Sequence, residues 1–130
     1  MALVVLLRGV NVGGRRTFRP AALVQQLTHL GAVNIGAAGT FVIGRPIARA
    51  RLRDEFARRL PFEADIMICD GRDIVRLISA HAAGGDAASD VVRFVSVLAS
   101  VPRAAPPVPI SLPPEGRCVV SRLRPAPESR

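Results

Sequence analysis

The sequence predicts a mixed α/β (α+β) protein in which a first lobe of residues 1–70 is followed by an abbreviated second lobe of residues 71–124. Two observations predict this class. Short aliphatic runs of strand length alternate with segments whose apolar residues recur every three or four positions, as on one face of a helix. Glycines and prolines separate these segments, and eight of the 11 prolines lie within residues 102–130. We expect residues 125–130 to form a disordered tail.

The first two elements are a strand and a helix joined by a glycine-rich loop. Leu3–Leu7 is a continuous aliphatic run, typical of a central strand that is covered on both faces. A loop at residues 8–16 follows, and a helix then begins at Pro20, which suits a first helical turn, and ends at Gly31. The buried stripe of this helix is predicted to consist of Leu23, Leu27 and Leu30.

The next elements complete the first lobe. Residues 32–43 predict a β-hairpin with its turn at Ala38-Gly39, and Ile66–Cys69 predicts a further strand. Between them a second helix follows Pro46 and is closed by Pro61, with a stripe formed by Ala48, Leu52, Phe56 and Leu60. The order β-α-β-β-α-β is that of a ferredoxin-like lobe, in which two helices pack on one face of an antiparallel sheet.

The second lobe begins with a helix that is capped by Asp70–Asp73 and carries Ile74, Leu77, Ile78 and His81 on one face. A strand is predicted at 91–98, with short strands at 109–112 and 117–123. Proline disfavours helix and central strand alike, so the proline-rich C-terminal segment is expected to be extended along an edge.

The basic residues of this 130-residue chain are unusual, because all 18 are arginine. Without lysine the chain cannot perform Schiff-base chemistry or use an orthodox Walker lysine, and without Trp or Tyr it lacks a large platform for base stacking. The formal net charge of +8 attracts phosphates, although the second helix is expected to pair much of its own charge at i, i+4 spacing. Those pairs are Arg51–Glu55, Asp54–Arg58 and Glu55–Arg59.

The candidate site is the glycine-rich loop, whose arginines have no acidic neighbour in the sequence. It nearly matches the phosphate-binding G-x-x-x-x-G-K-[ST] pattern, but Arg15 replaces the lysine and Arg16 replaces the magnesium-binding hydroxyl. Two interpretations stay open: a generic anion site of backbone amides and arginines, or a tight turn whose glycines only allow positive φ. The candidate residues are Arg8, Gly9, Asn11, Gly13, Gly14, Arg15 and Arg16.

Other candidate residues favour structural roles. His29 and His81 have no serine, cysteine or carboxylate at a diagnostic spacing, and Glu63 with Asp65 makes a metal pair without a third ligand. Phe41 occupies a base-stacking position of RNA-recognition sheets but has no aromatic neighbours on the first strand. We therefore expect no catalytic residues, no metal and no cofactor.

The residues that carry a resemblance to a known family are Leu6-Leu7-Arg8-Gly9-Val10-Asn11-Val12-Gly13-Gly14. This run is similar to the opening signature of the bacterial family called domain of unknown function 1697, and Gly39 with Thr40-Phe41-Val42 is similar to that family's hairpin turn and following strand. The resemblance implies a ferredoxin-like lobe, a second related lobe and no established activity. The chain is short for that family, and Ala38 and Thr40 stand where the family favours serine and asparagine.

These observations predict a cytoplasmic, non-catalytic anion- or phosphate-binding module. The expected partner is a phosphorylated small molecule or a nucleic-acid backbone. No membrane partner is expected, because no apolar run approaches the length of a membrane span. The alternative is a structural or protein-interaction module, including a homodimer, without a ligand site. An enzyme is the third expectation.

Overall fold

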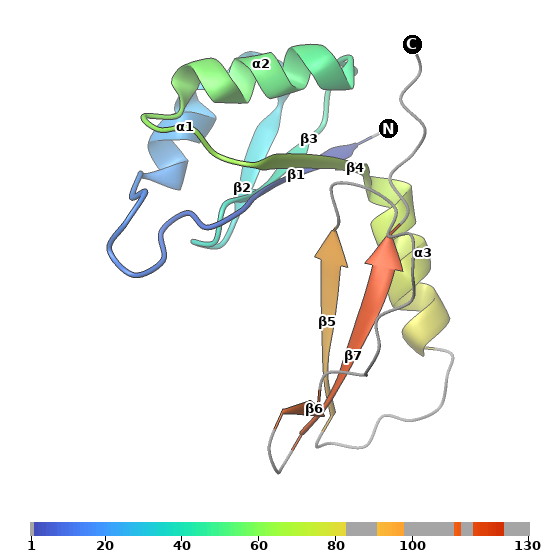
Figure 1. Cartoon of the computed structure of the whole chain (residues 1–130). Helices are drawn as coiled ribbons and strands as arrows, with labels where there is room; N and C mark the ends of the chain where they lie inside the picture. Colours follow the sequence, from blue (N-terminus) through green and yellow to red (C-terminus); the bar gives the residue numbers. More distant parts are fainter. Residues whose placement is uncertain (1, 83–90, 98–110, 113–115, 124–130) are drawn as a thin grey trace. The chain divides into compact units, whose positions relative to one another are not determined.

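The computed structural model describes residues 2–82, 91–97, 111–112 and 116–123 (Figure 1). The chain divides into two compact units, Met1–Arg72 and Asp73–Arg130, and each is described by itself. The first unit contains, in order, β1 (Leu3–Leu7), α1 (Pro20–Gln26), the 3₁₀ turn η1 (Thr28–Leu30), β2 (Ala32–Ile35), β3 (Thr40–Ile43), α2 (Arg49–Arg59) and β4 (Ile66–Asp70).

The four strands of the first unit form one antiparallel sheet with the order β2-β3-β1-β4. Strand β1 is central, and Val5 lies opposite Phe41 of β3 on one side and Ile68 of β4 on the other. This arrangement confirms the mixed α+β class and the aliphatic run at Leu3–Leu7 as a central strand.

The core lies between one face of this sheet and the two helices. Alternate residues of the central strands, Val5 and Phe41 among them, are fully buried in the same cluster as the apolar residues of α1 and α2. This alternation follows from the two-residue period of a strand, which places every second side chain on the helix-covered face. Phe41 also lies edge-on to Phe56 of α2, with ring centroids 5.3 Å apart.

The first helix differs from the expected single α-helix because its last turn is a 3₁₀ turn. The α-helical part stops at Gln26, and a 3₁₀ turn then carries the chain to Gly31, whose φ of 63° is left-handed. A 3₁₀ turn repeats every three residues, so it keeps Leu30 on the same buried face as Leu27. Gly31 supplies the conformation that ends the helix, as its position in the sequence predicts.

Helix α3 (Gly71–Ala82) begins at the end of the first unit and continues into the second unit, which also contains β5 (Val91–Val97), β6 (Ser111–Leu112) and β7 (Gly116–Leu123). The backbone N–H of Arg72 donates to Asp70 Oδ1 at 3.0 Å, which is the cap expected at this helix start. Strand β7 pairs with β5 in parallel and with β6 antiparallel.

The proline-rich stretch at 102–110 and the tail at 125–130 lie outside the described residues. None of the described helices is long and apolar enough to cross a membrane.

The turn between β2 and β3 presses closely on the end of β1. Leu7 donates its N–H to the carbonyl of Gly39 at 2.9 Å, and Gly39 has a φ of +79°. A Cβ atom at this position would lie 2.5 Å from Val10 Cγ2 and 3.0 Å from Leu7 Cβ. Position 39 therefore needs glycine for two separate reasons, its backbone conformation and the close approach of Leu7 and Val10.

We expect Gly39→Ala to lower the free energy of unfolding by about 2–4 kcal/mol, because it adds both backbone strain and steric overlap. Gly36→Ala is the matched control, since Gly36 has a φ of +70° but nothing within 4 Å of the added Cβ. This control should lose only about 1 kcal/mol. Urea unfolding followed by circular dichroism measures both values, and equal losses would show that the contact with Val10 is unimportant.

Candidate anion-binding loop

The candidate loop connects the end of β1 at Leu7 to the start of α1 at Pro20. Every residue from Val12 to Thr17 is exposed, and Figure 1 shows the loop extending beyond the end of the sheet. Val10, at its start, is only 1% exposed and belongs to the core cluster. The loop is therefore anchored in the core at one end and presented to solvent along its middle.

The middle of the loop is a short β-ribbon closed by a two-residue turn. Arg15 donates its N–H to the carbonyl of Val12 at 3.3 Å, and Asn11 donates to the carbonyl of Arg16 at 3.1 Å. Gly13 and Gly14 have φ values of 62° and 70°, both left-handed, as a type I′ turn requires. The glycines thus shape the turn, as one of the two interpretations of the sequence expects.

Asn11 holds this ribbon against the rest of the unit. Its side-chain Nδ2 donates to the carbonyl of Ala37 at 3.1 Å, and its Oδ1 accepts the N–H of Phe18 at 2.9 Å. Its own φ is 53°, a left-handed conformation that asparagine tolerates better than most residues. Both side-chain groups are used inside the protein, so the contacts of Asn11 are those of a residue that positions the loop.

Arg8 differs from the other loop arginines because Asp65 lies beside it. The pairing of β1 with β4 brings the two residues together, and the Arg8 N–H donates to the Asp65 carbonyl at 3.1 Å. The Arg8 guanidinium lies 3.9 Å from the Asp65 carboxylate, with both side chains about 70% exposed or more. Such an exposed pair is weak, but it partly neutralises the charge of Arg8.

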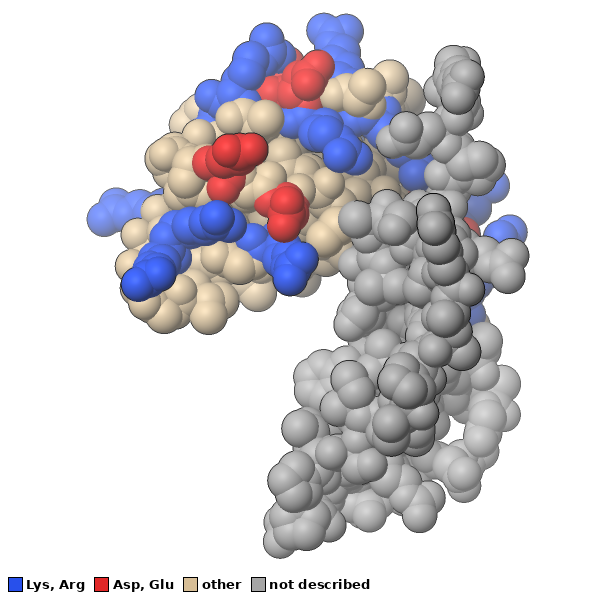
Figure 2. Space-filling model, in the orientation of Figure 1, with Lys and Arg blue, Asp and Glu red and all other residues tan. Residues whose placement is uncertain are grey.

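Arg15, Arg16 and Arg19 are exposed and carry unneutralised charge. Within residues 2–82, none of the three guanidinium groups is ion-paired with a carboxylate. The backbone N–H groups of Gly13 and Gly14 likewise donate to no acceptor in the described part of the chain. Figure 2 shows arginine side chains gathered at the end of the first unit where the loop lies. Positively charged guanidinium groups and neutral backbone N–H groups are thus both exposed as hydrogen-bond donors on this loop.

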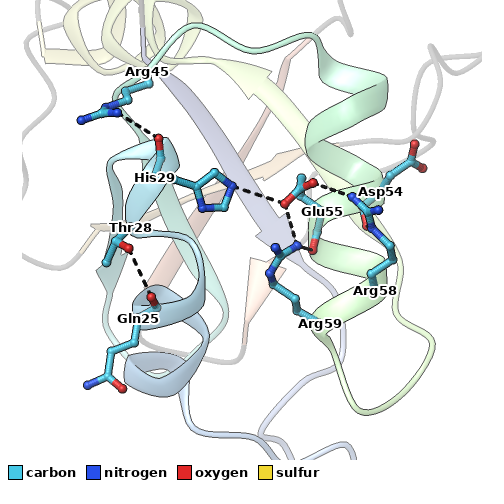
Figure 3. A network of polar contacts seen from close by, with 8 residues as sticks. All are labelled: Gln25, Thr28, His29, Arg45, Asp54, Glu55, Arg58 and Arg59. Carbon is cyan, nitrogen blue, oxygen red and sulfur yellow. Dashed lines mark hydrogen bonds and ion pairs between the residues drawn. The ribbon is translucent and has the colours of Figure 1, made fainter.

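A second cluster of polar residues surrounds Glu55, where the predicted Glu55–Arg59 pair is present and Arg58 and His29 join it. The contact with His29 could not be predicted because the two residues are far apart in the chain. Glu55 is buried, and its carboxylate lies 2.6 Å from the guanidinium of Arg59, 2.5 Å from that of Arg58 and 3.5 Å from His29 Nε2 (Figure 3). Arg58 reaches Asp54 only through the backbone carbonyl, at 3.3 Å, instead of the expected pair of side chains.

The Glu55 cluster ties α2 to η1. Burial raises the pKa of Glu55, but the positive charges of Arg59, Arg58 and His29 outweigh that effect and hold its pKa below the usual 4.5. The sequence offers no carboxylate at a diagnostic spacing from His29, and the fold brings the Glu55 carboxylate to 3.5 Å from its Nε2.

Three candidates remain, and the side chain of His81 lies outside the described residues. Phe41 is fully buried, so it cannot stack on a base. In the part of the chain that the structure describes, no three His, Cys, Asp or Glu side chains gather closely enough to hold a metal ion, and Glu63 with Asp65 has no third partner.

The fold and the exposed basic loop define a mixed α+β protein whose candidate site lies on a loop. The family described as "Protein of unknown function (DUF1697)" matches residues 1–109, and the chain belongs to this family. No curated protein and no solved structure matches the chain.

We expect acid to weaken the fold through Glu55. Because the folded-state pKa lies below the usual value, Glu55 stabilises the fold above pH 4.5, and this contribution is lost as the pH falls through the folded-state pKa. Glu55→Gln should therefore be less stable than the wild type at neutral pH, with a difference that shrinks in acid. Glu63→Gln, at an exposed carboxylate, is the control. If urea unfolding shows the same difference between the wild type and Glu55→Gln at every pH, this expectation is contradicted.

Replacing Asn11 should release the loop. We expect Asn11→Ala to lower the free energy of unfolding by about 2–3 kcal/mol, through two lost hydrogen bonds and a strained positive φ. Asn11→Gly removes the same hydrogen bonds without the strain and should lose about 1–2 kcal/mol. Circular dichroism measures the stability, since the chain has no Trp or Tyr. Hydrogen exchange at the Phe18 amide should accelerate in both variants, and unchanged exchange would show that Asn11 does not hold the loop.

Proposed function

We propose that the loop from Arg8 to Arg16 is a non-catalytic binding site for phosphate-like anions. The observation that carries the proposal is the pair Arg15 and Arg16, which are exposed, adjacent and without a carboxylate partner in the described residues. Guanidinium groups bind phosphate oxygens through two parallel hydrogen bonds, which makes arginine well suited to such ligands.

Three further features support binding at this loop. The Gly13 and Gly14 amides add neutral donors next to the guanidinium groups, as in the backbone nests that bind anions elsewhere. Asn11 orders the ribbon before a ligand arrives, which lowers the conformational entropy that binding would otherwise remove. Arg8 adds a partly neutralised charge at the base of the loop.

We also propose that the first lobe has the ferredoxin-like arrangement and that the protein is cytoplasmic. The order of elements and the strand order β2-β3-β1-β4 support a ferredoxin-like first lobe. Two cysteines 49 positions apart make a poor disulfide framework, which favours a reducing, cytoplasmic environment.

Titration of the ¹⁵N-labelled full chain with inorganic pyrophosphate tests the proposal. We expect amide shifts that saturate and are largest at Gly13 and Gly14. Arg15→Ala/Arg16→Ala should weaken binding at least about tenfold, because each charge-assisted hydrogen bond contributes about 1.5–3 kcal/mol.

The matched control is Arg51→Ala/Arg53→Ala, which removes the same charge from exposed positions on α2. This variant should bind pyrophosphate nearly as the wild type does. Equal weakening in the two double variants would mean that only net charge matters, and shifts spread over the whole unit would contradict a site at the loop.

A second candidate is a protein-interaction module that uses the edge strand β2. Val33 and Ile35 on this strand are 55% and 52% exposed, and an apolar edge strand without charge or proline is a template for pairing with another chain. A second copy of the protein could pair there as a homodimer. The pyrophosphate titration separates the two candidates, because this one requires no shift at Gly13 or Gly14.

A further inference from the structure

We propose that the anion bound by the loop is the phosphate backbone of duplex DNA, contacted without preference for base sequence. This inference rests on the proposed function and names the ligand class of the same site. It follows from the shape of the loop, its charge, the position of the aromatic residues and the exposure of Val12.

The shape of the loop favours an extended ligand. A small phosphorylated molecule is normally held in a concave pocket that buries most of its surface. Here the residues from Val12 to Thr17 are all exposed on a projecting ribbon. Two shallow depressions of the first unit lie on α2 and the segment after it, at 51–58 and 57–64, and neither includes a loop residue. A projecting ribbon fits a polymer that offers its phosphates along an open surface.

The charge of the loop favours a ligand with several phosphates. Arg15, Arg16 and Arg19 are exposed within five positions of one another, and none of them is neutralised by a carboxylate of the described residues. The first unit as a whole has 11 arginines and five acidic residues within positions 1–72. A surplus of this kind draws a polyanion toward the protein and displaces its counterions on contact.

The aromatic residues favour a duplex over a single strand. Proteins that bind single strands stack bases on exposed aromatic side chains. This chain has no Trp or Tyr, and Phe18 packs against Phe41 and Phe62, with ring centroids 6.4 and 6.0 Å away. A two-stranded β-ribbon instead fits the major groove of B-form DNA, about 12 Å wide, whereas the major groove of duplex RNA is too narrow.

Val12 gives the ribbon an apolar contact beside its charges. Its side chain is 67% exposed at the corner of the turn, bridged to Arg15 across the ribbon. In a groove this side chain would contact sugar rings while the arginines contact phosphates, and neither contact depends on the base sequence. A lipid surface is a poorer fit, because interfacial anchoring needs a broad apolar face and one valine is small.

Fluorescence anisotropy with the full chain and labelled DNA duplexes of about 20 base pairs, in two unrelated sequences, tests this inference. Three phosphate contacts should give a slope of about −3 when the logarithm of the binding constant is plotted against the logarithm of the salt concentration, between about 50 and 200 mM.

Arg15→Ala/Arg16→Ala should weaken binding at least about tenfold and make this slope shallower by about 2. Arg51→Ala/Arg53→Ala should leave the slope unchanged. Val12→Ser should weaken binding a few-fold, also without changing the slope.

Several outcomes would overturn the inference. Tighter binding to a single-stranded oligonucleotide or an RNA duplex of the same length, a strong difference between the two DNA sequences, or binding only to vesicles containing phosphatidylserine would each do so. Pyrophosphate shifts at Gly13 and Gly14 without DNA binding would overturn this inference and leave the anion site intact. Absence of both would overturn the proposed function as well.

Discussion

Strand β1 is paired along both of its edges, and the position of the basic loop depends on this double pairing. Because β3 and β4 hold it from either side, the strand cannot shift its register without breaking two ladders and turning Val5 out of the core. The same pairing carries Asp65 to Arg8 and the Gly39 turn to Leu7. The sheet therefore determines where the loop leaves the unit and which residues surround its base.

Some residues of the loop fix its conformation, and others leave their side chains exposed to solvent. The side chain of Asn11 is bonded to Ala37 and Phe18, and the left-handed conformations of Gly13 and Gly14 form the turn, while the N–H groups of the two glycines stay without an acceptor in the described residues. The neighbouring arginines remain exposed. A site on a loop normally loses affinity because the chain must be ordered on binding. Here a single asparagine, bonded to Ala37 and Phe18, orders the exposed loop without a ligand, so the proposed site would not need to order its chain on binding.

The elements of the first unit could be predicted from the sequence because their signals are local. The aliphatic run at Leu3–Leu7 and the left-handed stop at Gly31 depend only on neighbouring residues and on which face is buried. The candidate loop could also be located, from its glycines and arginines. Its contacts could not, because Asn11 with Ala37, like His29 with Glu55, joins segments that only the folded sheet brings together. The parallel pairing of β5 with β7 escaped prediction for the same reason.

The pairing of β1 with β4 also sets the order of events during synthesis. Leu7 leaves the ribosome well before its partner Ile66, which lies near the end of the first unit. Contacts so distant in sequence close slowly, since a long stretch of chain must be ordered before they form. The edge of β1 that pairs with β4 therefore stays unpaired until almost the whole unit has been synthesised. During that interval the arginine-rich loop that follows β1 in the sequence carries positive charge next to this unpaired edge. Charge beside an unpaired apolar strand opposes its aggregation with other chains.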